Sequence, residues 1–221
     1  MKLPFEKIYC LHLVEASDRY TNVLEECEKI NLENEVNFWY TTKKPINVTI
    51  GDCIETLHTP YYKRKIKVNP YTYAACFDCA YNNYSIIKQA YIRGINSILI
   101  FEDDIKFNED VNMLKDIIDN IPSDYDVIKL YNTCYNKDNK IENGVFFELL
   151  DENNCKHYYH STVCYALSRK GMKALIDKYE KKLEAADNVL DSIRLNKDIK
   201  FYTLKLNVFC THQDMKSTIV E

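Results

Sequence analysis

Residues 97–104, Ser97-Ile98-Leu99-Ile100-Phe101-Glu102-Asp103-Asp104, join a short apolar run to three consecutive acids. Three adjacent acids are by themselves uninformative in a chain with 33 Asp and Glu among 221 residues. The run before them, however, has the length and β-branched content of a buried strand. Ligands of open α/β sheets bind beyond the carboxyl ends of the strands, where these acids would emerge. The stretch therefore predicts a central strand that ends at a binding site.

The three carboxylates at 102–104 would repel one another unless a cation neutralised them. Mg²⁺ and Mn²⁺ prefer oxygen ligands and share them with substrate phosphates. A divalent-cation site is therefore the functional interpretation of this triplet. The alternative is an acidic loop that caps the next helix.

Strand and helix patterns alternate on both sides of this stretch. Apolar runs predict strands at 7–13, 36–40, 95–101, 125–131, 145–149, 163–167 and 199–206. Helical periodicity marks 17–30, 80–93, 110–121, 168–183 and 185–195, with Ser17 or Asp18 and then Ser168 as N-caps and Gly94 after the second helix. Residues 41–73 are expected to be irregular. No linker or repeat interrupts the pattern, so we expect one α/β domain over residues 1–221, with a mixed central sheet flanked by helices.

The composition narrows the class of protein. Apolar residues make up 46% of the chain and aromatic residues 13%, which indicates a packed globule. A net charge of −4 gives no support for a nucleic-acid-binding surface. No stretch approaches the roughly 18 apolar residues of a membrane span. The odd count of 9 cysteines, with no signal peptide before them, favours reduced thiols in a cytoplasmic compartment.

Further short motifs follow one another in a consistent order. They are Leu11-His12-Leu13 with Asp18-Arg19, Cys79-Ala80-Tyr81-Asn82-Asn83, Asp126-Val127-Ile128-Lys129-Leu130, Ser168-Arg169-Lys170-Gly171, Asp187-Asn188-Val189-Leu190, and Gln213 with Ser217-Thr218-Ile219. Together with the acids, they resemble glycosyltransferase family 25, the lipopolysaccharide and procollagen galactosyltransferases. His12 stands where that family usually has Asn, and Asn82-Asn83 replaces its Ser-His. The resemblance implies a GT-A-like fold and transfer of galactose or glucose from a UDP-sugar to a glycan or protein acceptor.

The resemblance also implies roles for particular side chains. Glu102 and Asp104 would bind Mn²⁺ or Mg²⁺, and His212 would complete the metal shell or else be a surface histidine. The cation would stabilise the charge that develops on the departing diphosphate. The donor would contact Leu13, Arg19, Asn83 and Asp103, with Arg19 on a phosphate or the uracil and Asp103 on the ribose. The alternative for Arg19 is a solvated position on a helix.

An inverting transfer, which the family implies, needs a carboxylate that deprotonates the acceptor hydroxyl. Asp187 is the first candidate for this base. Asp191 is the second, because it lies one helical turn further on the same face. The alternative for Asp187 is an acid that merely favours the first turn of its helix.

Four other interpretations remain open. A non-catalytic sugar- or protein-binding domain would account for Asn82-Asn83, although the intact acids count against it. A nucleotidyltransferase would use the same acids but usually needs a Gly-rich phosphate loop, and this chain has only 4 Gly. Cys155, His157, His160 and Cys164 have the residue types of a zinc site, and Cys76 and Cys79 form a single C-x-x-C pair; both are weaker signals.

Overall fold

The computed structural model describes residues 2–41, 70–131, 146–150, 161–194, 196–206 and 208–212, with the backbone alone at 70–77, 150 and 212. Its strands are β1 (Lys7–Leu13), β2 (Val36–Thr41), β3 (Ser97–Glu102), β4 (Ile105–Phe107), β5 (Val127–Lys129), β6 (Phe147–Leu150), β7 (Cys164–Ser168), β8 (Phe201–Leu204) and β9 (Cys210–His212). Its helices are α1 (Ser17–Lys29), α3 (Pro70–Ile92), α4 (Val111–Asp119), α5 (Arg169–Lys181) and α6 (Ala186–Ser192).

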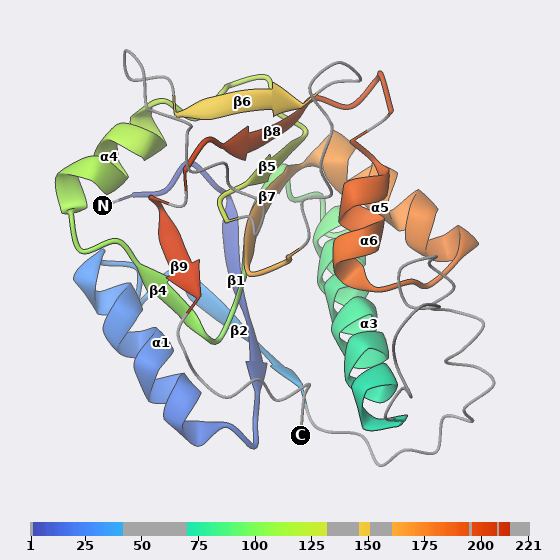
Figure 1. The fold of residues 1–221 in the computed structure, drawn as a ribbon, viewed down its shortest axis with the longest axis horizontal. Helices are drawn as coiled ribbons and strands as arrows, with labels where there is room; N and C mark the ends of the chain where they lie inside the picture. Colours follow the sequence, from blue (N-terminus) through green and yellow to red (C-terminus); the bar gives the residue numbers. More distant parts are fainter. Residues whose placement is uncertain are drawn as a thin grey trace.

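Within these residues, seven strands form a mixed sheet in the order β2-β1-β3-β7-β5-β8-β6, and β4 pairs with β9 (Figure 1). β1 runs parallel to β2 and β3, whereas β7 runs antiparallel to both β3 and β5. β8 is parallel to β5, and β6 is antiparallel to β8. β1, β2, β3, β5 and β8 therefore end on one side of the sheet, the carboxyl edge, and begin on the other, the amino edge.

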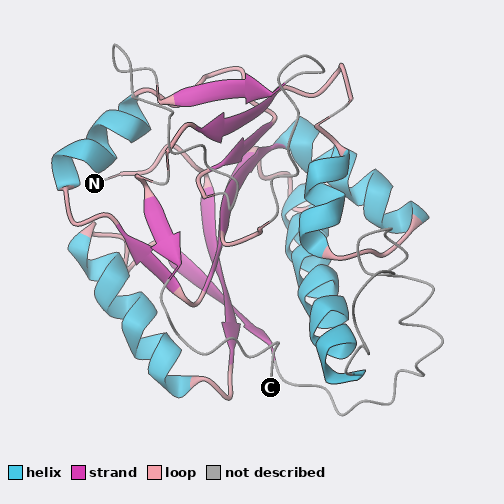
Figure 2. Cartoon of the chain, in the orientation of Figure 1, coloured by secondary structure: helices cyan, strands magenta, loops and turns pink. Residues whose placement is uncertain are grey.

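Helices cover both faces of this sheet (Figure 2). On β3, Leu99 and Phe101 belong to a core with side chains of α1 and α4, on what we call the α1 face. Ile98 and Ile100 belong to a second core with side chains of α3, α5 and α6, on the α6 face. This alternation is the ordinary consequence of strand geometry. The predicted α/β architecture with a mixed sheet flanked by helices is confirmed.

Most predicted elements are present, and the exceptions have local causes. Ser168 caps α5 as predicted, since its side chain accepts a hydrogen bond from the Gly171 amide. α1, in contrast, follows Ala16 and has no side-chain cap, so the prediction of Ser17 or Asp18 as N-cap was wrong. α3 begins at Pro70, ten residues before the predicted start at Ala80, so the prediction of irregular structure was wrong for residues 70–73, and its residues 42–69 lie outside the described part of the chain. Proline is favoured in the first turn, and that was the neglected signal.

The short strands β4 and β9 were not predicted, because three residues each are too few to show a pattern. Among the described helices, none has the length and apolarity that crossing a bilayer requires.

Candidate active site

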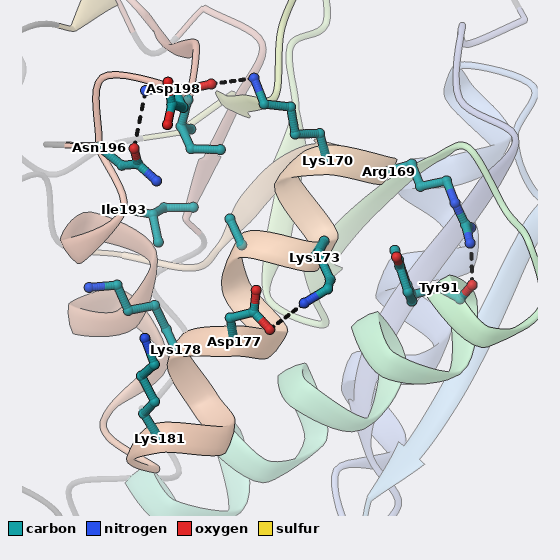
Figure 3. Close-up of a pocket in the computed structure, with 12 residues that line it drawn as sticks. Tyr91, Arg169, Lys170, Lys173, Asp177, Lys178, Lys181, Ile193, Asn196 and Asp198 are labelled. Atoms are coloured by element: carbon teal, nitrogen blue, oxygen red, sulfur yellow. Dashed lines mark hydrogen bonds and ion pairs between the residues drawn. The ribbon is translucent and has the colours of Figure 1, made fainter.

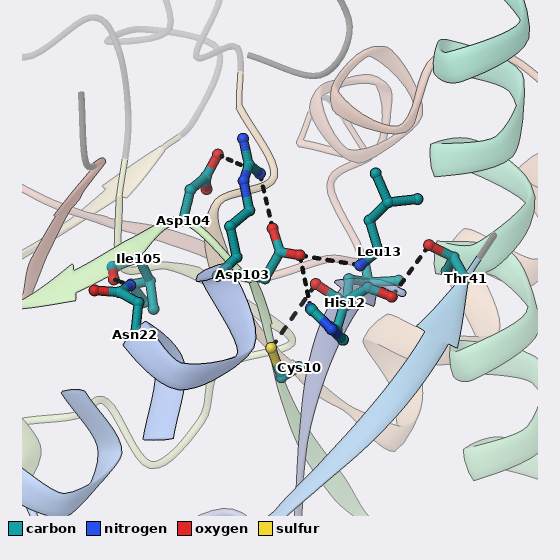
Figure 4. Close-up of polar contacts among 10 residues, drawn as sticks. Cys10, His12, Leu13, Asn22, Thr41, Asp103, Asp104 and Ile105 are labelled. Carbon is teal, nitrogen blue, oxygen red and sulfur yellow. Dashed lines mark hydrogen bonds and ion pairs between the residues drawn. The ribbon is translucent and has the colours of Figure 1, made fainter. Parts of the chain in front are cut away.

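The three consecutive acids lie at the carboxyl edge, beside the end of β1. Figure 4 shows two of them, Asp103 and Asp104. Glu102 is the last residue of β3, and Asp103 and Asp104 follow it directly. Glu102 continues the alternation of Ile98 and Ile100 and belongs to the α6 face. Asp103 contacts side chains of α1 and the end of β1 instead. The strand therefore distributes its acids to both faces of the sheet.

Asp103 is the centre of a buried polar network, and only 5% of its surface is exposed. One carboxylate oxygen, Oδ1, accepts a hydrogen bond from Arg19 at 2.8 Å. The other, Oδ2, accepts from the ring nitrogen Nδ1 of His12 and from the backbone amide of Leu13, both at 3.0 Å. Asp103 thus ties β3 to β1 and to the first turn of α1.

Arg19 serves a second acid as well. The same nitrogen, Nη1, lies 3.4 Å from an oxygen of Asp104, which is 6% exposed. Burial alone would lower the pKa of Arg19, but the hydrogen bond to Asp103 and the charges of Asp103 and Asp104 raise it above its ordinary value. A cation is therefore built into the acid cluster, on the α1 side.

Glu102 has a different environment from the other two acids. It is half-buried, and its Oε1 accepts a 2.6 Å hydrogen bond from the hydroxyl of Thr162, just before β7. The three adjacent acids therefore have three distinct sets of partners.

The pairing of β4 with β9 brings a distant segment to the acids. The backbone of His212 lies opposite Ile105, the residue that follows Asp104. Among the described side chains, which do not include that of His212, no three His, Cys, Asp or Glu residues are grouped to hold a metal ion.

The two asparagines that depart from the expected motif both bind neighbouring elements. Asn83 is fully buried on α3, where it donates to the carbonyl of Cys79 and accepts from the hydroxyl of Tyr165 on β7. Burial raises the pKa of Tyr165, so its hydroxyl keeps its proton. Asn82 accepts a 3.2 Å hydrogen bond from the indole of Trp39 on β2. The pair therefore fastens α3 to the sheet.

Both candidate bases lie on α6, one helical turn apart. Asp187 is half-buried in the first turn, and its Oδ1 accepts from the next amide, that of Asn188, at 2.8 Å. Asp191 is 4% exposed and forms an ion pair with Lys129, whose ammonium lies 3.7 Å from Asp191 Oδ1. Sequence reasoning missed Lys129, which looks like one ordinary polar residue of an apolar strand.

A groove of about 680 Å³ lies elsewhere, between α5 and residues 193–199 (Figure 3). Basic side chains of α5 line it, but Lys173 is paired with Asp177 and Arg169 donates to backbone carbonyls. None of the site residues predicted from the sequence lines this groove. It is therefore separate from the acids.

The weaker sequence signals fall mostly outside the described residues. This applies to Cys155, His157 and His160 of the suggested zinc site and to the side chain of Cys76. Their partner Cys164 lies on β7, where burial raises the pKa of its thiol well above the ordinary value.

The chain is similar to solved structures of glycosyltransferases. One similar solved structure is a glycosyltransferase involved in glycosylation of the major capsid of PBCV-1, with 11% identity and a TM-score of 0.39 over 86% of this chain and 66% of that one. A second is the galactosyltransferase LgtC, solved with donor and acceptor sugar analogs, with 12% identity and a TM-score of 0.42 over 85% of this chain and 70% of that one. The chain thus spans about two thirds of the length of each. No curated protein sequence matches significantly. The model of glycosyltransferase family 25 (LPS biosynthesis protein) matches residues 5–190, and this chain belongs to that family.

Proposed function

We propose that this protein transfers a hexose, galactose or glucose, from a UDP-sugar to a hydroxyl of a glycan or protein acceptor. The observation that carries the proposal is the acid cluster at the carboxyl edge, where Arg19 binds Asp103 and Asp104 in a nearly buried network. Ligands of sheets of this kind bind at that edge. Membership of glycosyltransferase family 25 over residues 5–190 supports the choice of chemistry.

The donor would lie at the ends of β1 and β3. Leu13, half-buried at the end of β1, and Arg19 remain our candidates for contact with it. Asp103 already binds groups through both oxygens, which favours a role in holding Arg19 and the β1 turn over a contact with the ribose. Asn83 is fully buried, so we assign it to holding Tyr165 rather than to the donor.

Glu102, Asp104 and His212 fit a divalent cation by the chemistry of their donor atoms. Two carboxylates and an imidazole suit Mn²⁺, and the carboxylates also suit Mg²⁺. The pairing of Ile105 with His212 supports including the histidine. When bound, the cation would supply positive charge to the departing diphosphate.

For the acceptor, we propose inverting transfer with Asp187 as general base. Its half-buried carboxylate would take the proton of the acceptor hydroxyl as that oxygen attacks the anomeric carbon. Asp191 is less suited, because its carboxylate is nearly buried and faces the ammonium of Lys129.

The test is release of UDP from a panel of UDP-sugars with Mn²⁺, first without and then with candidate acceptors. We expect the Asp104→Asn variant to lose on the order of 100-fold or more in kcat, because it weakens charge stabilisation at the leaving group. Asp116→Asn, at an exposed position on α4, is the matched control and should retain activity. Absence of UDP release from every donor, or full activity of Asp104→Asn, would contradict the proposal.

A non-catalytic binding domain is the second candidate, and it was suggested by Asn82-Asn83. Both asparagines bind the sheet, through Trp39 and Tyr165. These contacts do not involve Glu102, Asp103 or Asp104. A donor that raises the melting temperature without being consumed would favour this second candidate, since any ligand of the native state stabilises it.

A further inference from the structure

Lys129 is the last residue of β5, and none of its surface is exposed. Lysine is almost never fully buried without an ionic partner, because moving an ammonium out of water is costly. Such a residue in the centre of the sheet therefore requires a structural or functional explanation.

The ammonium of Lys129 lies 3.7 Å from the carboxylate of Asp191 on α6. The side chains of the two residues are 0% and 5% exposed, so solvent and salt screen their attraction weakly. The ion pair joins the end of a central strand to a helix packed on the α6 face.

The position of this ion pair relates it to the acids. Lys129 lies opposite Tyr165, which in turn lies opposite Ile100 of β3. Glu102 is two residues beyond Ile100, so side-chain alternation assigns Lys129 and Glu102 to the same face at the carboxyl edge. The helix that Lys129 holds is therefore adjacent to the functional end of the sheet.

α6 needs anchoring because it is short. It has seven residues, and its N-cap, Ala185, provides no side-chain hydrogen bond. Isolated helices of this length are unstable in water. Val189 and Leu190 are buried against the α6-face core and provide part of the attachment, but apolar contacts are non-directional. The ion pair adds an electrostatic attraction between two fixed points, one turn after Asp187.

We propose that Lys129 is a positioning residue: by binding Asp191 it holds α6 in place and so fixes the carboxylate of Asp187 at the acceptor side of the site. This inference rests on the proposed function, in which Asp187 is the general base. Lys129 itself does not touch the reacting atoms.

The test compares Lys129→Met with Lys115→Met, a control that breaks an exposed lysine–aspartate pair on α4. We expect Lys129→Met to lower the melting temperature by about 10 °C, because it leaves Asp191 charged and buried. Amide hydrogen exchange should accelerate in residues 186–192 and remain unchanged in α4. kcat should fall about 10- to 100-fold with little change in the donor KM, as expected when a base is misplaced. Lys115→Met should change none of these quantities.

The double variant Lys129→Met/Asp191→Leu covers the case in which the single variant does not fold. It should recover most of the melting temperature, because apolar replacement of a buried ion pair is often neutral, while kcat stays low. Unchanged exchange in α6, or wild-type kcat in either folded variant, would overturn the inference. Failure of the proposed function is detected separately, as absence of UDP release by the wild-type protein.

Discussion

At each edge of the sheet, one buried aspartate binds groups from separate segments of the chain. At the carboxyl edge, Asp103 accepts hydrogen bonds from His12, Leu13 and Arg19. At the amino edge, Asp126 accepts from the hydroxyl of Ser168, the ammonium of Lys170 and the amide of Lys200, each at 3.0 Å.

The two aspartates differ in the surroundings of their cations. The side chain of Lys170 is 58% exposed, whereas that of Arg19 is 8% exposed. Asp103 has acids on both sides in the sequence, and Arg19 also contacts Asp104. At the amino edge, the negative charge of Asp126 is therefore balanced by a lysine whose side chain reaches water. The carboxyl edge concentrates buried charge, which is typical of sites that perform chemistry.

Removing each aspartate tests this difference and should give the largest effect. Asp103→Ala leaves the guanidinium of Arg19 nearly buried without its main partner, and we expect a loss of about 3–5 kcal/mol in unfolding free energy. Asp126→Ala leaves an ammonium that can turn to water, so the loss should be about 1–3 kcal/mol. Chemical denaturation measures both. Equal losses would show that the two edges are built alike.

The packing of Gly171 tests how tightly α5 packs against Asp126 at the amino edge. A Cβ at this position would lie 2.0 Å from the carbonyl oxygen of Asp126, so α5 would have to move. We expect Gly171→Ala to cost about 3 kcal/mol. Gly94→Ala is the control: space is free there, although φ is +80°, and the cost should be about 1 kcal/mol. A smaller loss of unfolding free energy at Gly171 than at Gly94 would contradict tight packing of α5 against Asp126.

Replacing Arg19 by lysine and Lys170 by arginine should change the unfolding free energy by less. Arg19→Lys keeps the charge but loses the guanidinium that reaches both Asp103 and Asp104, and we expect a loss of about 1–2 kcal/mol together with lower affinity for the donor. Lys170→Arg, in an exposed position, should change stability by less than about 0.5 kcal/mol. Equal changes in unfolding free energy for the two variants would show that a lysine can replace Arg19 between Asp103 and Asp104.

The last test concerns a buried thiol on the α1 face, Cys27, which the carboxyl edge adjoins. Burial, followed by the charges of Glu26 and Glu33, raises the pKa of Cys27 from 9.0 to about 12. Its contribution to stability is present below pH 9 and is lost as the pH rises towards 12, because only the unfolded thiol ionises in that interval. Unfolding free energy should therefore decrease between pH 9 and 12, and the decrease should be smaller in Cys27→Ala. An identical pH profile for both proteins would contradict this assignment.

Sequence patterns predicted the elements that carry long apolar runs, and the acids were correctly expected at the end of β3. Three-residue strands such as β4 (Ile105–Phe107) were not predictable, because their stability comes from pairing with a distant segment. The burial of Lys129 was not predictable either. A lysine in an apolar strand usually points to solvent, and here its environment depends on Asp191, which is remote in sequence.

The network around Asp103 could be predicted only in part. Alternation along β3 could have shown that Glu102 and Asp103 belong to opposite faces. That His12 and Arg19 would occupy the oxygens of Asp103 depends on how α1 leaves β1, which follows from tertiary packing rather than from any local pattern.

The pairing of Ile105 with His212 also has a consequence for biosynthesis. A ribosome delivers β1, α1 and the acids early, but the strand that covers the segment just after the acids comes more than a hundred residues later. Contacts of such long range form late and slowly. A nascent chain would therefore carry β4 without its partner strand until β9 has emerged. We expect this strand pair, and with it the position of the His212 backbone opposite Ile105, to form only in chains that have been synthesised past residue 212.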